Sequence, residues 1–328
     1  MNEQIKIDFE KTFKTSGLSE TDVNLKKKFL DKFILNGFPN RKLENWKFSD
    51  INQIIHKNIG ELSFFSDYSS SNKIDTSVFI DGLEHNKIVF INGRVEKIDF
   101  SYEDDDKIKL NETSETESEI KSFNSLVDLN NAFSSKVYKI SIKKDYHLKK
   151  PLVIYHTTNN KIKSKSISIR LKFELDQNSS LRLIDYNYHQ SEKNFINIFY
   201  DLELKKNSIL KNYKIDNNHN KNIGYSFNNI NQDENSVSEN FILSSGSNFF
   251  KNEINCNLNG SYSSAFVNGI ISLLNDQQHE IRTSINHLVE NTKSYQLIKS
   301  VLGKDSKAIY QGKIFVNSEA QKTDGYQL

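Results

Sequence analysis

The sequence is poor in the residues that cross-link or interrupt a fold: its 328 residues include one cysteine, two prolines and twelve glycines. A single cysteine excludes an internal disulfide and any zinc site built from several cysteines. It is compatible with a reducing compartment such as the cytoplasm. Pro151 is the only proline after residue 39. Because proline cannot donate a hydrogen bond to a β-ladder, this scarcity favours long uninterrupted strands.

Excess charge of one sign and long apolar runs are also missing. Lysine and arginine number 44 against 42 aspartates and glutamates, which gives a net charge of +2. This balance favours neither nucleic acid nor an anionic membrane surface as a partner. No stretch approaches the ~20 apolar residues of a membrane-spanning helix, and the N-terminus lacks an apolar signal sequence. We therefore expect a cytoplasmic protein with no membrane or nucleic-acid partner.

The sequence patterns of common active sites are absent as well. Gly303-Lys304 lacks the glycine frame of a phosphate-binding loop, and no serine stands in the Gly-x-Ser-x-Gly pattern of hydrolases. Carboxylates are grouped only in residues 101–122. The alternative, a carbohydrate-active solenoid enzyme, needs two carboxylates within ~5–10 Å on one exposed face. We therefore predict that the chain is not an enzyme and has no catalytic or cofactor-binding residues.

Residues 1–60 are expected to form a small helical region. The polar residues 1–18 are interpreted as a loose tail. Ser19 can cap a following helix, which Gly37 would end. The apolar stripe of that helix comprises Leu25, Phe29 and Phe33. A second short helical stretch is expected between Leu43 and Ile51.

Residues 61–135 are interpreted as a hairpin followed by a linker. Asn92-Gly93 lies between two apolar runs and is a strong signal for a two-residue hairpin turn, because both residues tolerate positive φ. Residues 101–122 are rich in acidic residues, serine and threonine, and we interpret them as an exposed acidic loop.

From about residue 136 the apolar period changes to two. In residues 166–176 the odd positions are apolar and the even positions are polar, which predicts a strand with one buried face. Turn serines recur at spacings of 29, 28 and 25 residues, and a similar Asp305-Ser306 pair follows. These serines are Ser179, Ser208, Ser236 and Ser261. A strand-rich unit with this repeat is typical of a solenoid.

We therefore predict a mainly β fold. Its core, residues 136–328, would be a right-handed parallel β-helix, preceded by the small N-terminal helical region. An ordinary β-sandwich is the competing interpretation, but its strands recur at the shorter interval of about 8–12 residues.

Three residues are candidates for metal ligation. Cys256 shares its phase with flanking aliphatic residues, so core packing is the competing explanation for it. His279 and His287 lie eight residues apart in one predicted strand. Their Cα atoms would be roughly 26 Å apart on a straight strand, too far to share one ion.

Three segments resemble the SufB/SufD family of the SUF iron–sulfur cluster assembly system. The first, Arg41 to Asp50, contains Glu44, Trp46 and Lys47 and is similar to a motif of the SufD branch. The second is the hairpin Val89 to Arg94. The third runs from His287 to Asp324 and is similar to the characteristic part of the family core. Phe48 and Ser49 depart from the family's usual tyrosine and threonine.

The resemblance implies a scaffold protein that forms a heterodimer with SufB and acts with the ATPase SufC. A transient iron–sulfur cluster would form on the SufB–SufD complex, with none bound to this chain alone. A SufB-type scaffold is the alternative within the family. The family core continues beyond the segment that ends at Asp324, so we expect the chain to be an incomplete member, truncated at its C-terminal end.

The last predicted coil supplies the candidate partner interface. A terminal coil has a strand edge with free N–H and C=O groups, which is a template for another strand. The inward residues of this coil, expected to pack against few neighbours, are Ala308, Tyr310, Ile314 and Val316.

Overall fold

The structure is a computed structural model that describes residues 2–14, 16–65, 74–113, 124–217, 221–274 and 276–328. It is mainly β, with 48% strand, 17% helix and a β-solenoid of about 6 turns. The helices are α1 (Asn2–Lys14), α2 (Glu20–Asn36), α3 (Ile51–Asn58), α4 (Ser125–Phe133) and the short 3-10 helices η1 (Glu44–Trp46) and η2 (Thr76–Val78). Among the described helices, none is long and apolar enough to cross a membrane.

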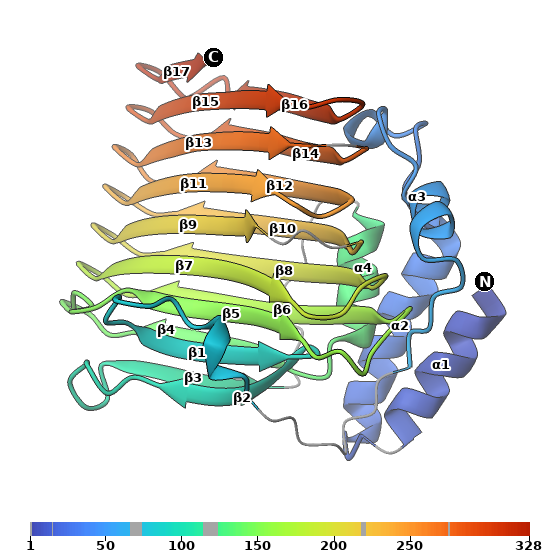
Figure 1. Ribbon diagram of the computed structural model, residues 1–328. Coiled ribbons are helices and arrows are strands. Elements are labelled where there is room, and N and C mark those ends of the chain that lie inside the picture. Colours follow the sequence, from blue (N-terminus) through green and yellow to red (C-terminus); the bar gives the residue numbers. More distant parts are fainter. Residues whose placement is uncertain (1, 15, 66–73, 114–123, 218–220, 275) are drawn as a thin grey trace.

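The strands form two sheets whose members alternate along the chain (Figure 1). The nine-stranded sheet has the order β17-β15-β13-β11-β9-β7-β5-β1-β2, and the eight-stranded sheet has the order β16-β14-β12-β10-β8-β6-β4-β3. The strands are β1 (Asn86–Ile91), β2 (Arg94–Asp99), β3 (Ile108–Thr113), β4 (Val137–Ile142), β5 (Leu152–Thr158), β6 (Ser166–Leu175), β7 (Ser180–His189), β8 (Phe195–Leu204), β9 (Ile209–Asn217), β10 (Ile223–Gln232), β11 (Val237–Ser245), β12 (Phe249–Leu258), β13 (Ser264–Leu273), β14 (Gln278–His287), β15 (Lys293–Leu302), β16 (Lys307–Val316) and β17 (Asp324–Gln327).

Parallel pairing of successive coils confirms the predicted β-solenoid. From β4 onward each strand pairs in parallel with the strand one coil away, as in β8–β10 and β10–β12. Among the described strands, only β1–β2 and β3–β4 pair antiparallel. A β-sandwich is therefore wrong for this chain.

The predicted turn repeat closes one corner of the stack. In each of five coils a residue with φ between 56° and 64° ends the turn, and the next residue carries a hydroxyl. These residues are Asn178, Asn207, Asn235, Tyr262 and Asn291. Ser179 and Ser236 donate to the carbonyls of Asp176 and Asp233 at 2.6 and 2.7 Å.

Two members of the predicted repeat were wrong. Ser263, not Ser261, follows the left-handed residue and donates to the Gly260 carbonyl at 2.7 Å. Asp305-Ser306 connects β15 to β16 and therefore lies at the opposite corner. A tyrosine at a position that asparagine fills in the other coils hid the true register, because asparagine is the usual non-glycine residue at positive φ.

The first halves of β6, β8, β10 and β12 are largely buried on both faces, which corrects the prediction of one buried face for this part of β6. The inner side chains of the eight-stranded sheet, such as Ile169 and Leu202, fill the solenoid. Its outer side chains, such as Phe199 and Tyr225, form a second core with the N-terminal helices and α4. Even Arg170, an even-numbered position of β6, is only 2% exposed. Figure 1 shows these helices along one side of the stack.

The N-terminal tail is a helix and not a loose segment. Helix α1 buries Ile5, Phe9 and Phe13 at intervals of four residues. Asp8, also buried, accepts a hydrogen bond from the backbone N–H of Phe64 at 2.7 Å. Four-residue spacing is the signature of an amphipathic helix. The polar residues between these three concealed it.

Helix α2 agrees with its predicted ends. Ser19 caps it by accepting from the backbone N–H of Asp22, and Gly37 follows its last residue. The buried face, however, comprises Lys26, Leu30 and Phe33. Leu25 and Phe29 are only half-buried.

The acidic segment is not wholly a loop. Residues 108–113 form β3, which extends the eight-stranded sheet. Glu103 accepts hydrogen bonds from Asn86 at 2.7 Å, from Tyr146 at 2.8 Å and from the backbone N–H of Lys149 at 3.0 Å. Residues 114–123 lie outside the described ranges. The hairpin prediction is confirmed, since β1 and β2 pair antiparallel around Asn92 and Gly93, both at positive φ.

Candidate functional site

A charged cluster lies inside the solenoid, between the two sheets. The Asp185 carboxylate on β7 lies 2.5 Å from the Lys214 ammonium on β9 and 3.2 Å from Nε2 of His156 on β5. Tyr200 on β8 donates its hydroxyl to the same carboxylate at 2.5 Å. All four side chains are at most 3% exposed. Each comes from a different strand, so the cluster connects three coils.

The partners of Asp185 compensate for its removal from water. Burial alone would raise the pKa of this carboxyl, but the charges of Lys214 and His156 hold its pKa well below the usual value. The Lys214 ammonium also lies 4.2 Å from the Tyr200 ring centroid and donates to Ser226 at 2.8 Å. The cluster is therefore a buried ion pair, in which loss of one partner would leave the other charge buried without compensation.

A second group of hydrogen-bonded polar side chains joins β9, β11, the turn before β12 and β14. Ser247 donates to the Asp216 carboxylate at 3.0 Å. His279 lies 3.3 Å from the Ser247 hydroxyl and 2.8 Å from the Ser244 hydroxyl. Burial raises the pKa of Asp216 to about 7 and lowers the pKa of His279 to about 4. At neutral pH the histidine is therefore neutral, while Asp216 holds a proton part of the time.

The cavity beside Asp216 is small. It has a volume of about 20 Å³ and is lined on its polar side by Asn187, Asp216 and Ser247. Gly224 is needed next to it, because a Cβ there would lie 2.3 Å from the Phe250 ring. This volume holds about one water molecule. This cavity can therefore hold a water molecule, but not an organic substrate.

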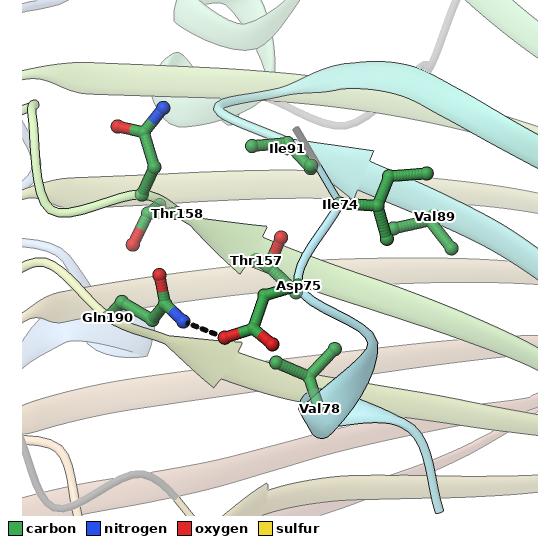
Figure 2. A pocket seen from close by; sticks show the side chains of 9 residues that line it. Ile74, Asp75, Val78, Val89, Ile91, Thr157, Thr158 and Gln190 are labelled. Atoms are coloured by element: carbon green, nitrogen blue, oxygen red, sulfur yellow. Dashed lines mark hydrogen bonds between the residues drawn. The ribbon is translucent and has the colours of Figure 1, made fainter. Parts of the chain in front are cut away.

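A second cavity lies outside the nine-stranded sheet (Figure 2). Ile74 and Val78 cover Val89 and Ile91 of β1 there, and Asp75 accepts from Gln190 at 2.7 Å. This cavity also measures about 20 Å³ and is mostly aliphatic. Among the described residues that line it, the ionisable group is the carboxylate of Asp75, and Thr157 and Thr158 supply hydroxyls.

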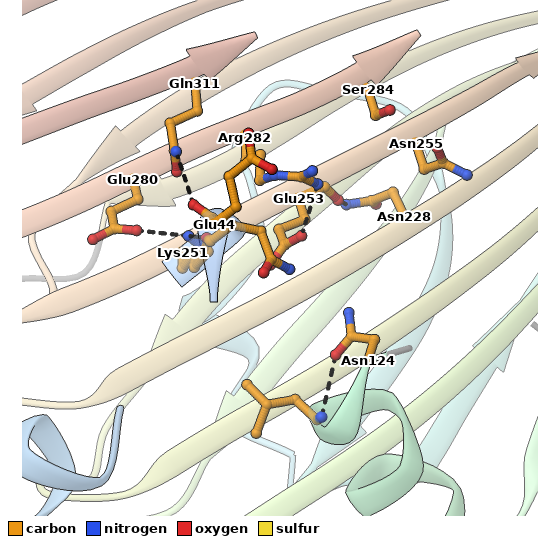
Figure 3. Close-up of polar contacts among 12 residues, drawn as sticks. Glu44, Asn124, Asn228, Lys251, Glu253, Asn255, Glu280, Arg282, Ser284 and Gln311 are labelled. Carbon is orange, nitrogen blue, oxygen red and sulfur yellow. Dashed lines mark hydrogen bonds and ion pairs between the residues drawn. The ribbon is translucent and has the colours of Figure 1, made fainter. Parts of the chain in front are cut away.

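A third polar group lies on the outer face of β12 and β14 and fastens the N-terminal region (Figure 3). The Lys251 ammonium lies 2.7 Å from the Glu280 carboxylate, donates to the Asn45 carbonyl at 2.7 Å and lies 4.5 Å from the Trp46 ring centroid. Gln311 donates to the Glu44 carbonyl at 3.3 Å. The residues of the first resemblance segment therefore have a structural role, which is to dock that segment on the solenoid.

Cys256 lies on the inner face of β12 and is fully buried. Burial raises the pKa of its thiol to about 12, against a hydrogen bond with Ser238 that acts in the opposite direction. Since the thiolate is the form that binds metals and attacks sulfur, this cysteine is poorly suited to ligate iron or to react.

His279 and His287 lie on β14, as the period predicted, and the structure does not bring them together. His287 lies 2.6 Å from the Thr292 hydroxyl and 2.9 Å from the Ser294 hydroxyl, while the His279 ring contacts hydroxyls of the β11–β12 turn region. Within the ranges the structure describes, no three His, Cys, Asp or Glu side chains are grouped as a metal site would require.

The candidate interface residues lie on β16, which is at the edge of the eight-stranded sheet. Ala308, Tyr310 and Ile314 are half-buried, and Val316 is 49% exposed. Tyr310 donates to Gln296 at 3.1 Å. The inner face of this strand is therefore less covered than that of β12 or β14, as the sequence predicted.

The interior charged residues were not predicted from the sequence, although a signal for them existed. Asp185 shares the inward phase of Leu181 and Leu183, and Lys214 shares that of Leu210. A charge in the buried phase of a strand predicts an internal partner. The identity of that partner depends on the pairing of coils.

Comparison with known proteins gives two findings. Residues 156–328 match the family described as SUF system FeS cluster assembly, SufBD core domain. The chain is also 21% identical over 303 residues to the iron–sulfur cluster assembly protein SufD of Escherichia coli (strain K12), a match that covers 90% of this chain and 70% of the relative. The family match begins in β5 and includes both interior polar groups.

Lys214→Met should destabilise the protein by about 3–5 kcal/mol, because it leaves the Asp185 carboxylate buried without its closest cation. Chemical unfolding followed by circular dichroism measures this loss. The matched control is Lys211→Met on the same strand, whose partially exposed pair with Glu239 at 3.1 Å should be worth less than about 1 kcal/mol. Equal effects of the two variants would contradict the assigned role of Lys214.

Asp216→Asn should flatten the pH dependence of stability between about pH 4 and pH 7. The folded protein retains the Asp216 proton up to a pKa of about 7, whereas the unfolded chain releases it near 4. Because the pKa is raised on folding, the stabilising contribution of this one group is fully present below pH 4 and is lost as the pH rises, by at most about 1.4 kcal/mol per pH unit. A pH-independent difference in unfolding free energy between wild type and variant would refute it. Lys214 and Asp185 face the same region and are unchanged in both proteins.

Proposed function

This chain belongs to the SufBD core family of the SUF system, and on that premise we propose that it is a scaffold for iron–sulfur cluster assembly that acts in a complex with SufB and the ATPase SufC. The family gives the chain a role in SUF iron–sulfur cluster assembly. The observation that carries the proposal is the family match over 156–328, which lies on the solenoid. Within the family, the SufD relative favours a SufD-type over a SufB-type role.

A scaffold role is supported by the chemistry of the interior. Asp185 and Lys214 pair with each other inside the solenoid, and the cavities beside Asp216 and Asp75 hold about one water each. An enzyme would need a substrate-sized pocket with convergent polar groups. The cytoplasmic location expected from the single cysteine is part of the same proposal.

The proposed contact with SufB uses the edge of β16. This strand pairs with β14 on one side, and its outward Phe315 is 42% exposed beside the 49% exposed Val316. An unpaired strand edge with apolar side chains is suited to strand addition by a partner.

In this proposal the iron–sulfur cluster is the cargo of the complex. Cys256 is buried with a raised pKa, and His279 and His287 each contact hydroxyl groups. We propose that the cluster is built on the SufB–SufD-type complex and that this chain alone retains none.

The complex is tested by co-expressing the chain with SufB and SufC and purifying through a tag on the chain. We expect both partners to co-purify with wild type. Phe315→Lys/Val316→Lys should lose SufB, because two charges at the strand edge oppose docking of an apolar partner. The matched control is Leu274→Lys, which replaces a side chain that is 62% exposed between β13 and β14. Absence of SufB with wild type would refute the proposed complex, and retention by the double variant would refute the β16 contact.

Anaerobic incubation of the purified chain with iron and sulfide should produce no stoichiometric cluster. A stable cluster normally has four protein ligands, most often cysteine thiolates, and this chain has one buried thiol. Absorption spectroscopy after desalting provides the measurement. Cluster absorbance that disappears in Cys256→Ser would show that the thiol is a ligand after all.

A further inference from the structure

The outer face of the nine-stranded sheet carries an apolar stripe that the described helices leave uncovered. Outward side chains align across the sheet, since Phe241 pairs with Tyr213 and Leu243 pairs with both Ile215 and Ile270. On β13, Asn268 lies between Phe241 and Leu297 of β15. We define the apolar stripe as Tyr213, Ile215, Phe241, Leu243, Ile270 and Leu297. Tyr213 and Ile270 are 39% and 38% exposed, and the others are half-buried. None of the six belongs to the three hydrophobic clusters of the described residues.

The stripe continues a surface that the chain itself already covers. At the β1–β5 end of the same face, Val78 packs on Val89, Val153 and Tyr155, and this cluster reaches as far as Ile184 and Tyr186 on β7. Ile184 pairs with Tyr213, and Tyr186 pairs with Ile215. The apolar surface therefore passes without interruption from a covered part to an open part.

The eight-stranded sheet shows what kind of element covers such a surface in this protein. Its outward aromatic side chains, including Phe199 and Phe249, are at most 2% exposed because helices and the segment that follows them pack over them. Helix α2 runs alongside the stack in Figure 1. An aromatic and aliphatic outer face is thus complementary to a helix, and the nine-stranded sheet offers the same chemistry without one.

The dimensions of the stripe fit one helix. Neighbouring strands lie about 4.8 Å apart, so the five strands from β7 to β15 span about 19 Å. A helix of about 13 residues has this length, and its diameter of about 10 Å covers two rows of side chains. A second copy would need roughly 800 Å² of contact per partner for a stable dimer. A footprint of about 19 Å by 10 Å is roughly a quarter of that area.

The charged residues around the stripe favour a partner with negative charge. We consider the outward positions of the five strands β7, β9, β11, β13 and β15. They carry one carboxylate, Glu239, and four cations, which are Arg182, Lys211, Lys293 and Lys299. Glu239 lies 3.1 Å from Lys211 and is neutralised by it. Lys293 and Lys299 are exposed at one end of the stripe.

We infer that the apolar stripe is a docking site for an amphipathic helix of a partner protein, about 13 residues long, with acidic residues beside its apolar face. The inference goes beyond the proposed assembly role and uses neither β16 nor the family match. Apolar contact supplies the affinity, while the lysines favour acidic over basic helices.

The test uses two synthetic helical peptides of this length with the same leucine stripe, one flanked by glutamate and the other by lysine. Fluorescence anisotropy should show binding of the glutamate peptide to the full chain and at least about tenfold weaker binding of the lysine peptide. Phe241→Lys/Leu243→Lys should abolish binding, because these half-buried outward residues form the centre of the stripe. The matched control, Asn231→Lys/Asn257→Lys on the outer face of the other sheet, should bind as wild type.

A charge swap keeps the test decisive if the central variant unfolds. Lys293→Glu/Lys299→Glu replaces two exposed side chains and should reverse the preference between the two peptides. Failure of the glutamate peptide to bind wild type, or equal binding of both peptides, would overturn the inference. Self-association of wild type that Phe241→Lys removes would overturn it too, since a second copy would then be the occupant.

Discussion

Parallel, in-register stacking of coils is the constraint on which this structure depends. Each inward side chain lies directly over the same position of the next coil, as Ile198 lies beside Ser226 and Ser226 beside Asn252. A polar residue admitted to the interior must therefore find its partner in the same column or across the narrow space between the sheets. Asp185 does both, through Lys214 and Tyr200. The charged cluster follows from the stacking and also opposes any slip in register, which would separate its members.

The same constraint explains how much of the fold could be predicted. Period-two alternation in 166–176 and the recurring turn serines report local geometry, and both led to the solenoid. Helix α1 was missed although Ile5, Phe9 and Phe13 have helical spacing, because the surrounding residues are polar. Local sequence also does not show which face of a strand will be covered by helices. Arg170 occupies a polar position in the pattern and is buried only because distant residues fold over it.

The candidate site was harder to predict for a related reason. Cys256 was placed correctly on a buried face and the two histidines in one strand, yet their chemistry depends on neighbours from other coils, such as Ser244 for His279. Cysteine and histidine are common metal ligands, so the sequence analysis singled out individual positions of these types. The buried charged cluster of Asp185 and Lys214 instead arises because stacking brings separate strands together. His156, Asp185 and Lys214 lie in different strands and belong to no sequence motif.

A solenoid with a sealed interior can interact only through its faces and its strand edges. The helices cover part of the outer face of the eight-stranded sheet. The residues that hold them there, including Lys251 and Trp46, already take part in that contact. Two accessible kinds of surface are left. The edge of β16 offers backbone groups to the proposed strand partner, while the outer face of the nine-stranded sheet offers side chains to the proposed helix. Because these surfaces belong to different sheets and use different chemistry, one partner need not displace the other, which is the property that a scaffold requires.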